Sequence, residues 1–179
     1  APRIHMSEFS QYKGLFAEGG GFDVPTSASA GIAYQLADPL TVTLDWQRIH
    51  YSDVNSVGNP LIPNLMTAPL GTDGGAGFGW EDINVAKVGM QWRASDEWTW
   101  RAGYSQADQP IPSSEVLFNI LAPGVIKQHI TAGGTKALAR GGNFNFSVMY
   151  APSNKVTGAN PLEVPGRQTI AIEMHEWEV

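Results

Sequence analysis

The sequence predicts an all-β protein and, within that class, an antiparallel transmembrane β-barrel. Apolar and polar residues alternate in runs about as long as a strand, the pattern of a sheet with two different faces. Short and long connections also alternate along the chain, and Trp and Tyr residues lie near the predicted strand ends. The 20 glycines, 12 prolines and six tryptophans among 179 residues likewise favour strands and turns over helices.

Each predicted strand is an alternating run bounded by turn residues. In one of them Leu40, Val42 and Leu44 point to one face, while Thr41 and Thr43 point to the other. The same alternation recurs near residues 86–93, 98–105, 144–150 and 170–175. We therefore expect strands near residues 1–9, 26–36, 40–51, 82–94, 98–107, 125–139, 143–151 and 168–179.

The connections distinguish a barrel from other β folds. Tight hairpin turns are expected at residues 37–39, 95–97 and 140–142. Long loops lie between them, near residues 10–25, 52–81, 108–124 and 152–167. Because the two kinds alternate, all long loops emerge at one end of the sheet, as in barrels with short periplasmic turns and long extracellular loops. A soluble β-sandwich would show strict alternation only by coincidence.

Aromatic residues fit the same prediction. Trp92, Trp98 and Trp100 flank one tight turn, and Trp46 and Tyr51 lie at the far end of their strand. Barrels in lipid carry girdles of Trp and Tyr at both interfaces. The alternative is that these rings form the core of a soluble β-protein.

Composition argues against several other functions. The 11 Lys and Arg residues form no basic stripe and the formal charge is -6, so we expect no nucleic-acid partner. The absence of cysteine excludes a disulfide scaffold, a thiolate metal site and a Cys nucleophile. His5, His50, His129 and His175 lack the spacing of metal ligands, and His175 has no second histidine of a zinc-protease motif. We expect no enzyme activity, no metal and no cofactor.

One predicted loop is unusually apolar. Pro110, Pro112 and Pro123 mark residues 108–124 as a loop, since proline fixes φ and removes a donor from the ladder. Loops lie on the surface and are normally polar. This one nevertheless contains the apolar residues Val116, Leu117, Phe118, Ile120 and Leu121.

Several segments together resemble a known family. They are Tyr12–Ala17 (YKGLFA), Gly21–Pro25 (GFDVP), Asp45–Ile49 (DWQRI), Trp100–Tyr104 (WRAGY) and the opening of the loop at Pro110–Pro112 (PIP). In these segments, and in their order along nearly the whole chain, the sequence resembles the FadL/OmpP1/TodX family of outer-membrane transporters for hydrophobic molecules.

The resemblance implies an architecture and a location. Members of the family are fourteen-stranded barrels plugged by an N-terminal hatch, in the outer membrane of Gram-negative bacteria. Residues 1–179 are expected to form the C-terminal part of one such barrel, with about eight strands and without the hatch or the first strands. The expected surroundings are outer-membrane lipid and lipopolysaccharide, and the expected state is a monomer.

The resemblance also gives the apolar loop a function. It implies that extracellular loops form an apolar groove, which takes up a long-chain fatty acid or a hydrocarbon and passes it through the barrel and sideways into the bilayer. The first candidates are Val116, Leu117, Phe118, Ile120 and Leu121. A second set in a similar loop is Leu61, Ile62, Leu65 and Met66. The alternative is that these residues only pack on one another and hold the loops in place.

Polar residues of the predicted strands are expected to face the lumen. They are Asp45, Gln47, Lys87, Gln91, Arg93, Arg101, Glu173 and His175. Because barrel lumens are generally polar, pairing across strands is favoured over binding of a ligand carboxylate.

Three hypotheses remain open at this point. The first is a passive outer-membrane channel for hydrophobic molecules, which predicts apolar outward residues at Val42, Val88, Trp100 and Phe146. The second is a soluble β-sandwich that binds a ligand or a carbohydrate and buries those residues. The third is a general porin or a structural barrel, and the apolar loops argue against the water-filled lumen with polar loops that it predicts.

Overall fold

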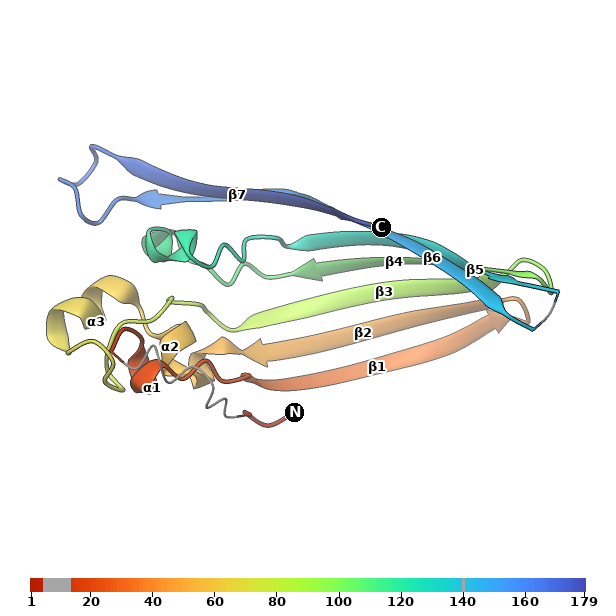
Figure 1. Cartoon of the computed structure of the whole chain (residues 1–179), viewed down its shortest axis with the longest axis horizontal. Helices are drawn as coiled ribbons and strands as arrows, with labels where there is room; N and C mark the ends of the chain where they lie inside the picture. The colour runs from red at the N-terminus through yellow and green to blue at the C-terminus, as the bar shows by residue number, and fades with distance from the viewer. Residues whose placement is uncertain (5–13, 140) are drawn as a thin grey trace.

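The computed structural model describes residues 1–4, 14–139 and 141–179, and its dominant element is one curved antiparallel sheet (Figure 1). Seven strands follow one another in the order of the sequence, each paired with the next. They are β1 (Thr26–Ala37), β2 (Leu40–His50), β3 (Ile83–Arg93), β4 (Trp98–Ala107), β5 (Gln128–Ala137), β6 (Asn143–Ala159) and β7 (Thr169–Glu178). The first and last strands form the two edges of this open sheet.

The expected separation of short turns and long loops is confirmed. All tight turns lie at one end of the sheet, and the helical segments lie at the other (Figure 1). The long loops contain α1 (Ala17–Gly20), η2 (Tyr51–Asp53), α2 (Asn55–Gly58), α3 (Leu61–Thr67), η3 (Ser113–Glu115) and η4 (Phe118–Ile120). Among the described residues, no helix is long and apolar enough to cross a membrane.

The register places the two kinds of side chain on opposite faces. Val88 pairs with Leu44 and with Tyr104, so an apolar row crosses three strands on one face. Lys87 pairs with Asp45 and with Ser105, so a polar row crosses the same strands on the other face. We call the first face outward and the second inward. The outward residues are large, apolar and exposed, among them Ile32, Leu44, Trp46, Val88, Met90, Trp92, Trp100, Tyr104, Ile130, Phe144, Phe146 and Val148.

β6 differs from the prediction, because it continues to Ala159 instead of ending near residue 151. Pro152 favours an end to the strand, since it cannot donate to the ladder. The pairing with β7 is irregular between Ala151 and Asn154, and a bulge is a position where a strand tolerates proline. The predicted loop 152–167 is therefore reduced to the connection at 160–168.

The irregularity also changes which residues face inward. Beyond it Asn154 donates to the backbone oxygen of Val125 in the neighbouring loop, so Asn154 lies on the inward face. Val156 and Ile172, which pair with each other, also pack inward on loop residues. The upper part of the β6–β7 hairpin is therefore apolar inside, opposite to the lower part of the sheet.

The predicted strand at 1–9 lies mostly outside the described residues. Within them, Ile4 forms an isolated antiparallel bridge with Val24. The remaining strand predictions agree with the structure to within three residues at each end.

Candidate functional site in the loop cluster and the lumen face

Three segments far apart in the sequence meet through four phenylalanine rings. Phe16 packs on Phe22 edge to face, with ring centroids 4.8 Å apart. Phe78 stacks on Phe16 at 5.2 Å and on Phe118 at 4.8 Å. Aromatic pairs at such separations contribute about 0.5–1.5 kcal/mol each beyond the area they bury. We call Phe16, Phe22, Phe78 and Phe118 the phenylalanine cluster.

Asn119 is the buried polar link between two of these segments. Its amide oxygen accepts a hydrogen bond from Trp80 Nε1 at 2.6 Å. Its amide nitrogen donates to the backbone oxygens of Phe78 at 2.7 Å and Glu115 at 2.9 Å. Since the side chain is fully buried, all three bonds are shielded from water. Asn119 therefore fixes the apolar loop 108–124 to the segment 78–80.

Glu115 is the second polar link. The residue is 5% exposed, and its carboxylate accepts a hydrogen bond of 2.8 Å from the backbone N–H of Leu61, the first residue of α3. A carboxylate at this position satisfies an unpaired donor and interacts favourably with the helix dipole. Gly79 leaves room for it, because a Cβ there would lie 2.3 Å from Glu115 Cγ. Gly79 also has a φ of 68°, which favours glycine.

The apolar loop packs against the inward face of the β6–β7 hairpin. Ile111, Val116 and Val125 of the loop form a buried cluster with Ile172 of β7. The backbone approaches closely here, since a Cβ on Gly158 would lie 1.8 Å from the backbone oxygen of Ser113. The loop is therefore seated on the sheet instead of projecting freely from it.

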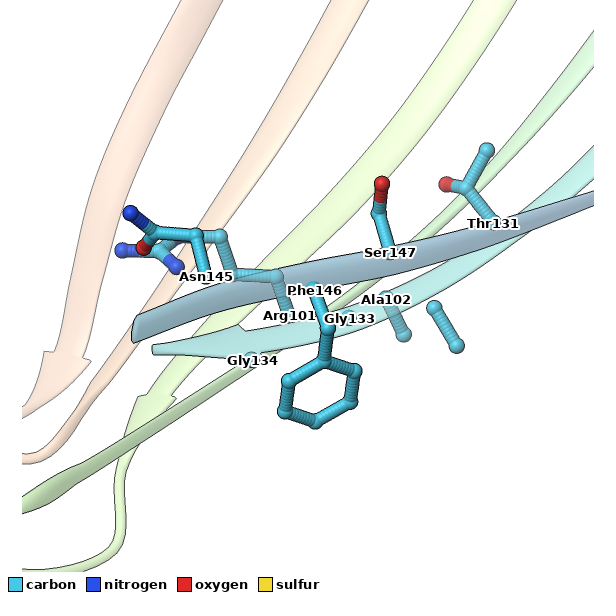
Figure 2. Close-up of a pocket in the computed structure, with 9 residues that line it drawn as sticks. Arg101, Ala102, Thr131, Gly133, Gly134, Asn145, Phe146 and Ser147 are labelled. Carbon is cyan, nitrogen blue, oxygen red and sulfur yellow. The ribbon is translucent and has the colours of Figure 1, made fainter. Parts of the chain in front are cut away.

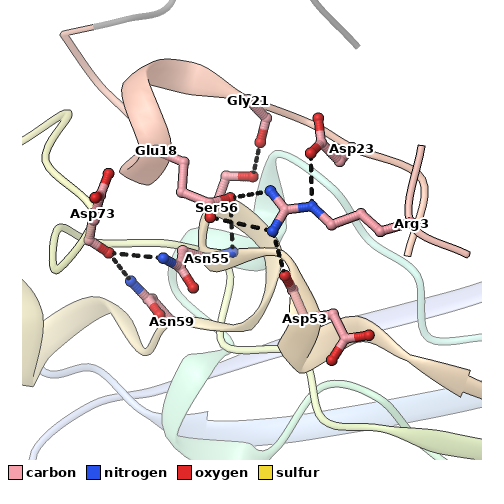
Figure 3. A network of polar contacts seen from close by, with 9 residues as sticks. All are labelled: Arg3, Glu18, Gly21, Asp23, Asp53, Asn55, Ser56, Asn59 and Asp73. Atoms are coloured by element: carbon pink, nitrogen blue, oxygen red, sulfur yellow. Dashed lines mark hydrogen bonds and ion pairs between the residues drawn. The ribbon is translucent and has the colours of Figure 1, made fainter. Parts of the chain in front are cut away.

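A charged network holds Arg3 and residues 18–23 against residues 53–56 (Figure 3). The Arg3 guanidinium donates to Asp23 Oδ2 at 2.6 Å, to Glu18 Oε2 at 2.5 Å and to the backbone oxygen of Asp53 at 2.7 Å. The hydroxyl of Ser56, fully buried, donates to the backbone oxygen of Gly21. Hydrogen bonding to Glu18 comes first among the effects that raise the pKa of Arg3 above its usual value, partly opposed by burial.

The structure divides the predicted groove residues into three groups by their exposure. Val116 is fully buried and Phe118 belongs to the phenylalanine cluster, so both hold the loop in place. Leu117, Leu61 and Ile62 are half-buried. The residues with the most exposed surface are Ile120 at 55%, Leu121 at 69%, Leu65 at 41% and Met66 at 80%.

A hollow of about 420 Å³ lies between the loops, and none of the predicted groove residues is among those that line it. Its volume is within the range of small-molecule sites, roughly 300–1,000 Å³. Trp80, Pro60 and Pro112 contribute its apolar walls, while Asp82 and Glu115 contribute charge. A signal for this site was present in Gly77-Phe78-Gly79-Trp80, where large rings stand isolated in a glycine-rich loop.

Six of the eight predicted lumen residues lie together on the inward face, and four of them form two pairs across strands. Lys87 Nζ donates to Gln47 Oε1 at 3.2 Å. Arg101 donates to Gln91 Oε1 at 2.9 Å and to Thr135 Oγ1 at 2.7 Å, and Thr135 in turn donates to Asn145. The inward residues Asp45 and Arg93 complete the group.

Glycines on the inward face leave two depressions in the lumen wall. One of about 390 Å³ centres on Gly133, and Figure 2 shows Arg101, Thr131 and Asn145 on one side of the strands and Phe146 on the other. The other, of about 360 Å³, lies over Gly89 and Gly103. Thr131 lines both depressions, so they are continuous along the wall.

The structure places Glu173 away from the other predicted lumen residues. It accepts a hydrogen bond from Ser153 at 2.7 Å, and Lys155 Nζ lies 4.0 Å from its carboxylate. These residues alternate with the inward Asn154 and Val156, so Glu173 and its neighbour two positions on, His175, lie on the outward face. The reason is the register of β7, in which Glu173 and His175 share a face with Trp177, the partner of the outward Tyr150.

Asp82 joins the ends of β2 and β3 beside the loops. Its carboxylate accepts hydrogen bonds from Ser52 at 2.8 Å and from His50 Nδ1 at 2.8 Å. Burial acts to raise the pKa of Asp82, but the hydrogen bonds from Ser52 and His50 outweigh it, so the pKa lies below its usual value. The charged carboxylate therefore stabilises this junction.

The comparisons with known proteins bear on the fold. No protein-family model and no curated protein matches the sequence. Among solved structures, the toluene transporter TodX of Pseudomonas putida aligns with 87% of this chain and 33% of its own, at 20% identity and a TM-score of 0.57. The toluene transporter TbuX of Ralstonia pickettii aligns with 87% and 32%, at 18% identity and a TM-score of 0.51. A FadL homologue of Pseudomonas aeruginosa aligns with 78% and 30%, at 14% identity and a TM-score of 0.53.

These observations define the class of fold as part of an antiparallel β-barrel with an apolar exterior. The particular fold is that of the FadL/TodX family. The chain spans about a third of the length of the solved structures it matches.

Proposed function

We propose that this chain is the C-terminal part of an outer-membrane barrel through which hydrophobic molecules enter passively, without chemical conversion. The observation that carries the proposal is the exposed apolar exterior of the sheet. Val88, Trp100 and Phe146 are 42%, 40% and 40% exposed, whereas a β-sandwich would bury them. A lipid environment removes such surface from water, and the missing barrel strands would pair the open edges of β1 and β7.

The loops support a hydrophobic substrate in particular. Ile120, Leu121, Leu65 and Met66 expose apolar surface at the loop end of a barrel whose inner wall is polar. In a general porin the loops would present polar groups to a water-filled lumen. Each CH₂ group of a ligand buried on this surface contributes about 0.8 kcal/mol, which favours capture of long apolar chains.

Within this class we propose long-chain fatty acids as the substrate. The family resemblance and the similarity to a FadL homologue support them. Two other similar structures are toluene transporters, so monoaromatic hydrocarbons are the competing substrates to test.

Binding to the full-length protein in detergent tests the proposal. A fluorescent long-chain fatty acid is titrated into wild type and into an Ile120→Ser/Leu121→Ser variant. Loss of the apolar contact should weaken binding about tenfold, or about 1.4 kcal/mol. Leu162→Ser/Val164→Ser is the matched control, because these residues are equally exposed at 73% and 61% but lie in the β6–β7 connection.

Equal affinities for wild type and both variants would contradict capture by the apolar loop. Displacement of the probe by toluene but not by unlabelled fatty acid would replace the fatty acid with a monoaromatic substrate. A full-length protein that remains soluble without detergent would contradict the membrane barrel itself.

A further inference from the structure

Residues 14–18 cover part of the phenylalanine cluster. They carry Phe16, whose ring centroid lies 5.2 Å from that of Phe78 and 5.5 Å from that of Phe118. Both Phe16 and Phe78 are buried in this arrangement. Phe118 begins η4, which leads directly to the exposed Leu121. If Phe16 moved away, the rings of Phe78 and Phe118 would become a continuation of the exposed apolar surface of the loop.

This segment ends in a strained backbone conformation. Among the described residues, Glu18 is the one non-glycine residue with a positive φ, at 53°. Gly19 and Gly20 follow with φ values of 65° and 81°, so three consecutive residues have left-handed φ angles. A residue with a Cβ adopts such a conformation only where the surrounding contacts impose it. The glycines change φ at little cost, so they provide a hinge next to the strained residue.

Arg3 supplies the contacts that hold Glu18 in this conformation. Its guanidinium donates to both carboxylate oxygens of Glu18, at 3.2 Å and 2.5 Å. The backbone N–H of Asn55 donates to the same carboxylate at 3.3 Å. The side chains of Arg3 and Glu18 are 33% and 21% exposed, so water and salt compete with their ion pair. The strained conformation is therefore held by an interaction that solvent can break.

The residues beyond the glycines are fixed more firmly. Arg3 donates to Asp23 Oδ2 at 2.6 Å, and the side chain of Asp23 is 1% exposed. The hydroxyl of the fully buried Ser56 donates to the backbone oxygen of Gly21. Arg3 therefore stays attached to this part of the loops when its bonds to Glu18 are broken.

We propose that residues 14–18 form a lid, latched shut by Arg3 and Glu18, and that the hydrophobic ligand binds to Phe78 and Phe118 when the lid opens. The ligand then takes the place of the Phe16 ring, which leaves with the lid. The proposal rests on the proposed function, because it assumes that the loops capture such a ligand. It adds a conformational step to that capture.

Opening of the lid and binding of the ligand are measured separately on the full-length protein in detergent. Hydrogen exchange of the Ala17 amide, which bonds to the backbone oxygen of Ala76 at 3.2 Å, reports opening. Stopped-flow mixing with the fluorescent fatty acid gives the association rate. Arg3→Gln should raise both rates by about threefold or more, because an ion pair that favours the closed lid is lost. Arg3→Lys keeps the charge and should restore much of the closed population.

The matched control for the latch is Arg48→Gln. Arg48 lies at the same end of the sheet, where its guanidinium donates to Asn84 and Asp82. This variant removes an arginine of similar exposure without touching the lid. It should change neither the exchange of Ala17 nor the association rate.

A cross-link tests the lid in the opposite direction. In Ala17→Cys/Ala76→Cys, a disulfide ties the lid to the neighbouring loop at a position where the two backbones are hydrogen-bonded. The oxidised form should lose rapid association, and reduction should restore the wild-type rate. Each single variant, treated with the same oxidant, should bind as fast as wild type.

The strain at Glu18 is tested by two substitutions that both remove the carboxylate. Glycine accepts the positive φ freely, whereas alanine does not. Exchange at Ala17 should therefore be faster in Glu18→Ala than in Glu18→Gly.

Three results would overturn the lid. They are faster exchange in Arg3→Gln without faster association, equal association in the oxidised and reduced cross-linked forms, and equal exchange in Glu18→Ala and Glu18→Gly. Equally fast binding by the oxidised and reduced forms would remove only the lid. Failure of wild type and of the reduced form to bind the fatty acid would instead remove the proposed substrate.

Discussion

The lower and upper halves of the sheet are built on opposite principles. Below Tyr150 and Trp177, apolar side chains such as Val88 and Phe146 face outward and polar ones such as Lys87 face inward. Above that level the β6–β7 hairpin is polar outside and apolar inside. One irregularity reverses the faces of β6, because side chains alternate along a strand with a period of two. β7 alternates without interruption, and its inward face changes from polar to apolar between Glu176 and Met174.

The two halves are also stabilised differently. The lower half depends on continuous backbone ladders between neighbouring strands, which pair the backbone groups of the inner strands. The upper half depends on buried side chains, including Asn119 and Glu115, that join loops with few ladder bonds of their own. Substitutions in the lower half should therefore change the free energy of unfolding in lipid, whereas those in the upper half should change the hydrogen exchange of the loop amides.

The largest effect is expected for a charge on the outward face of the lower half. Val88→Arg should lower the free energy of unfolding of the full-length protein in lipid by about 2–4 kcal/mol, the cost of an arginine near the membrane centre. Gln91→Arg, on the inward face of the same strand, should change it far less. Urea unfolding in lipid vesicles measures both. Equal destabilisation would show that the outward face does not contact lipid.

The next largest effect is expected in the upper half. Asn119→Ala leaves the Trp80 indole N–H and the Phe78 backbone oxygen buried without their bonds, at about 1–3 kcal/mol each. Hydrogen exchange of the loop amides should show that the free energy of local opening falls by about 2–3 kcal/mol. Asn64→Ala, which removes bonds to Gly74 and Gly75 near the surface, is the control. Similar effects from both would refute the central role of Asn119.

A smaller effect is expected where the loop meets the hairpin. Gly158→Ala places a methyl group against the backbone of Ser113 and should cost about 1–3 kcal/mol by overpacking. Gly142→Ala should be nearly neutral, since its Cβ would meet only Leu138 Cδ1 at 3.7 Å. Hydrogen exchange of the amides in residues 111–116 measures the difference between the two variants. Unchanged protection in Gly158→Ala would mean that the loop is not seated on β6.

The smallest effect is expected from pH. The pKa of Asp82 is lowered in the folded protein, so its stabilisation is present above its unfolded value of 3.8 and is lost as the pH falls through the folded pKa. Because the ion pair is partly exposed and therefore screened by solvent, the change should stay below about 1 kcal/mol. Exchange at residues 50–54 should rise on acidification below about pH 4 in wild type. Asp82→Asn should show faster exchange at neutral pH and no added acid response, and an identical acid response in the variant would exclude Asp82 as the cause.

The sequence predicted the strands and their alternation well, because period-two polarity is a local signal. It did not predict that β6 passes through Pro152, since whether a proline ends a strand depends on the partner strand. The sequence also misplaced Glu173, whose face follows from the pairing of Trp177, on the same face of β7, with the outward Tyr150. Local patterns do not contain that register.

The candidate site was predicted only in outline. The apolar loop was correctly located, but its sequence does not distinguish the buried Val116 from the exposed Leu121. That distinction comes from contact with β7, which is distant in the sequence. The phenylalanine cluster was missed for the same reason, because Phe16, Phe78 and Phe118 come from three separate loops.

The reversal of faces along β6 is tested most directly by site-directed spin labelling. The chain contains no cysteine, so labels are placed at Val148, Val156 and Thr157 in a cysteine-free full-length protein reconstituted in lipid. Collision with oxygen, which concentrates in lipid, and with a water-soluble nickel complex is measured at each position. We predict that Val148 meets mainly oxygen, that Thr157 meets mainly the nickel complex, and that Val156 is protected from both. Equal nickel accessibility at Val148 and Thr157 would contradict a membrane boundary at the β6 irregularity.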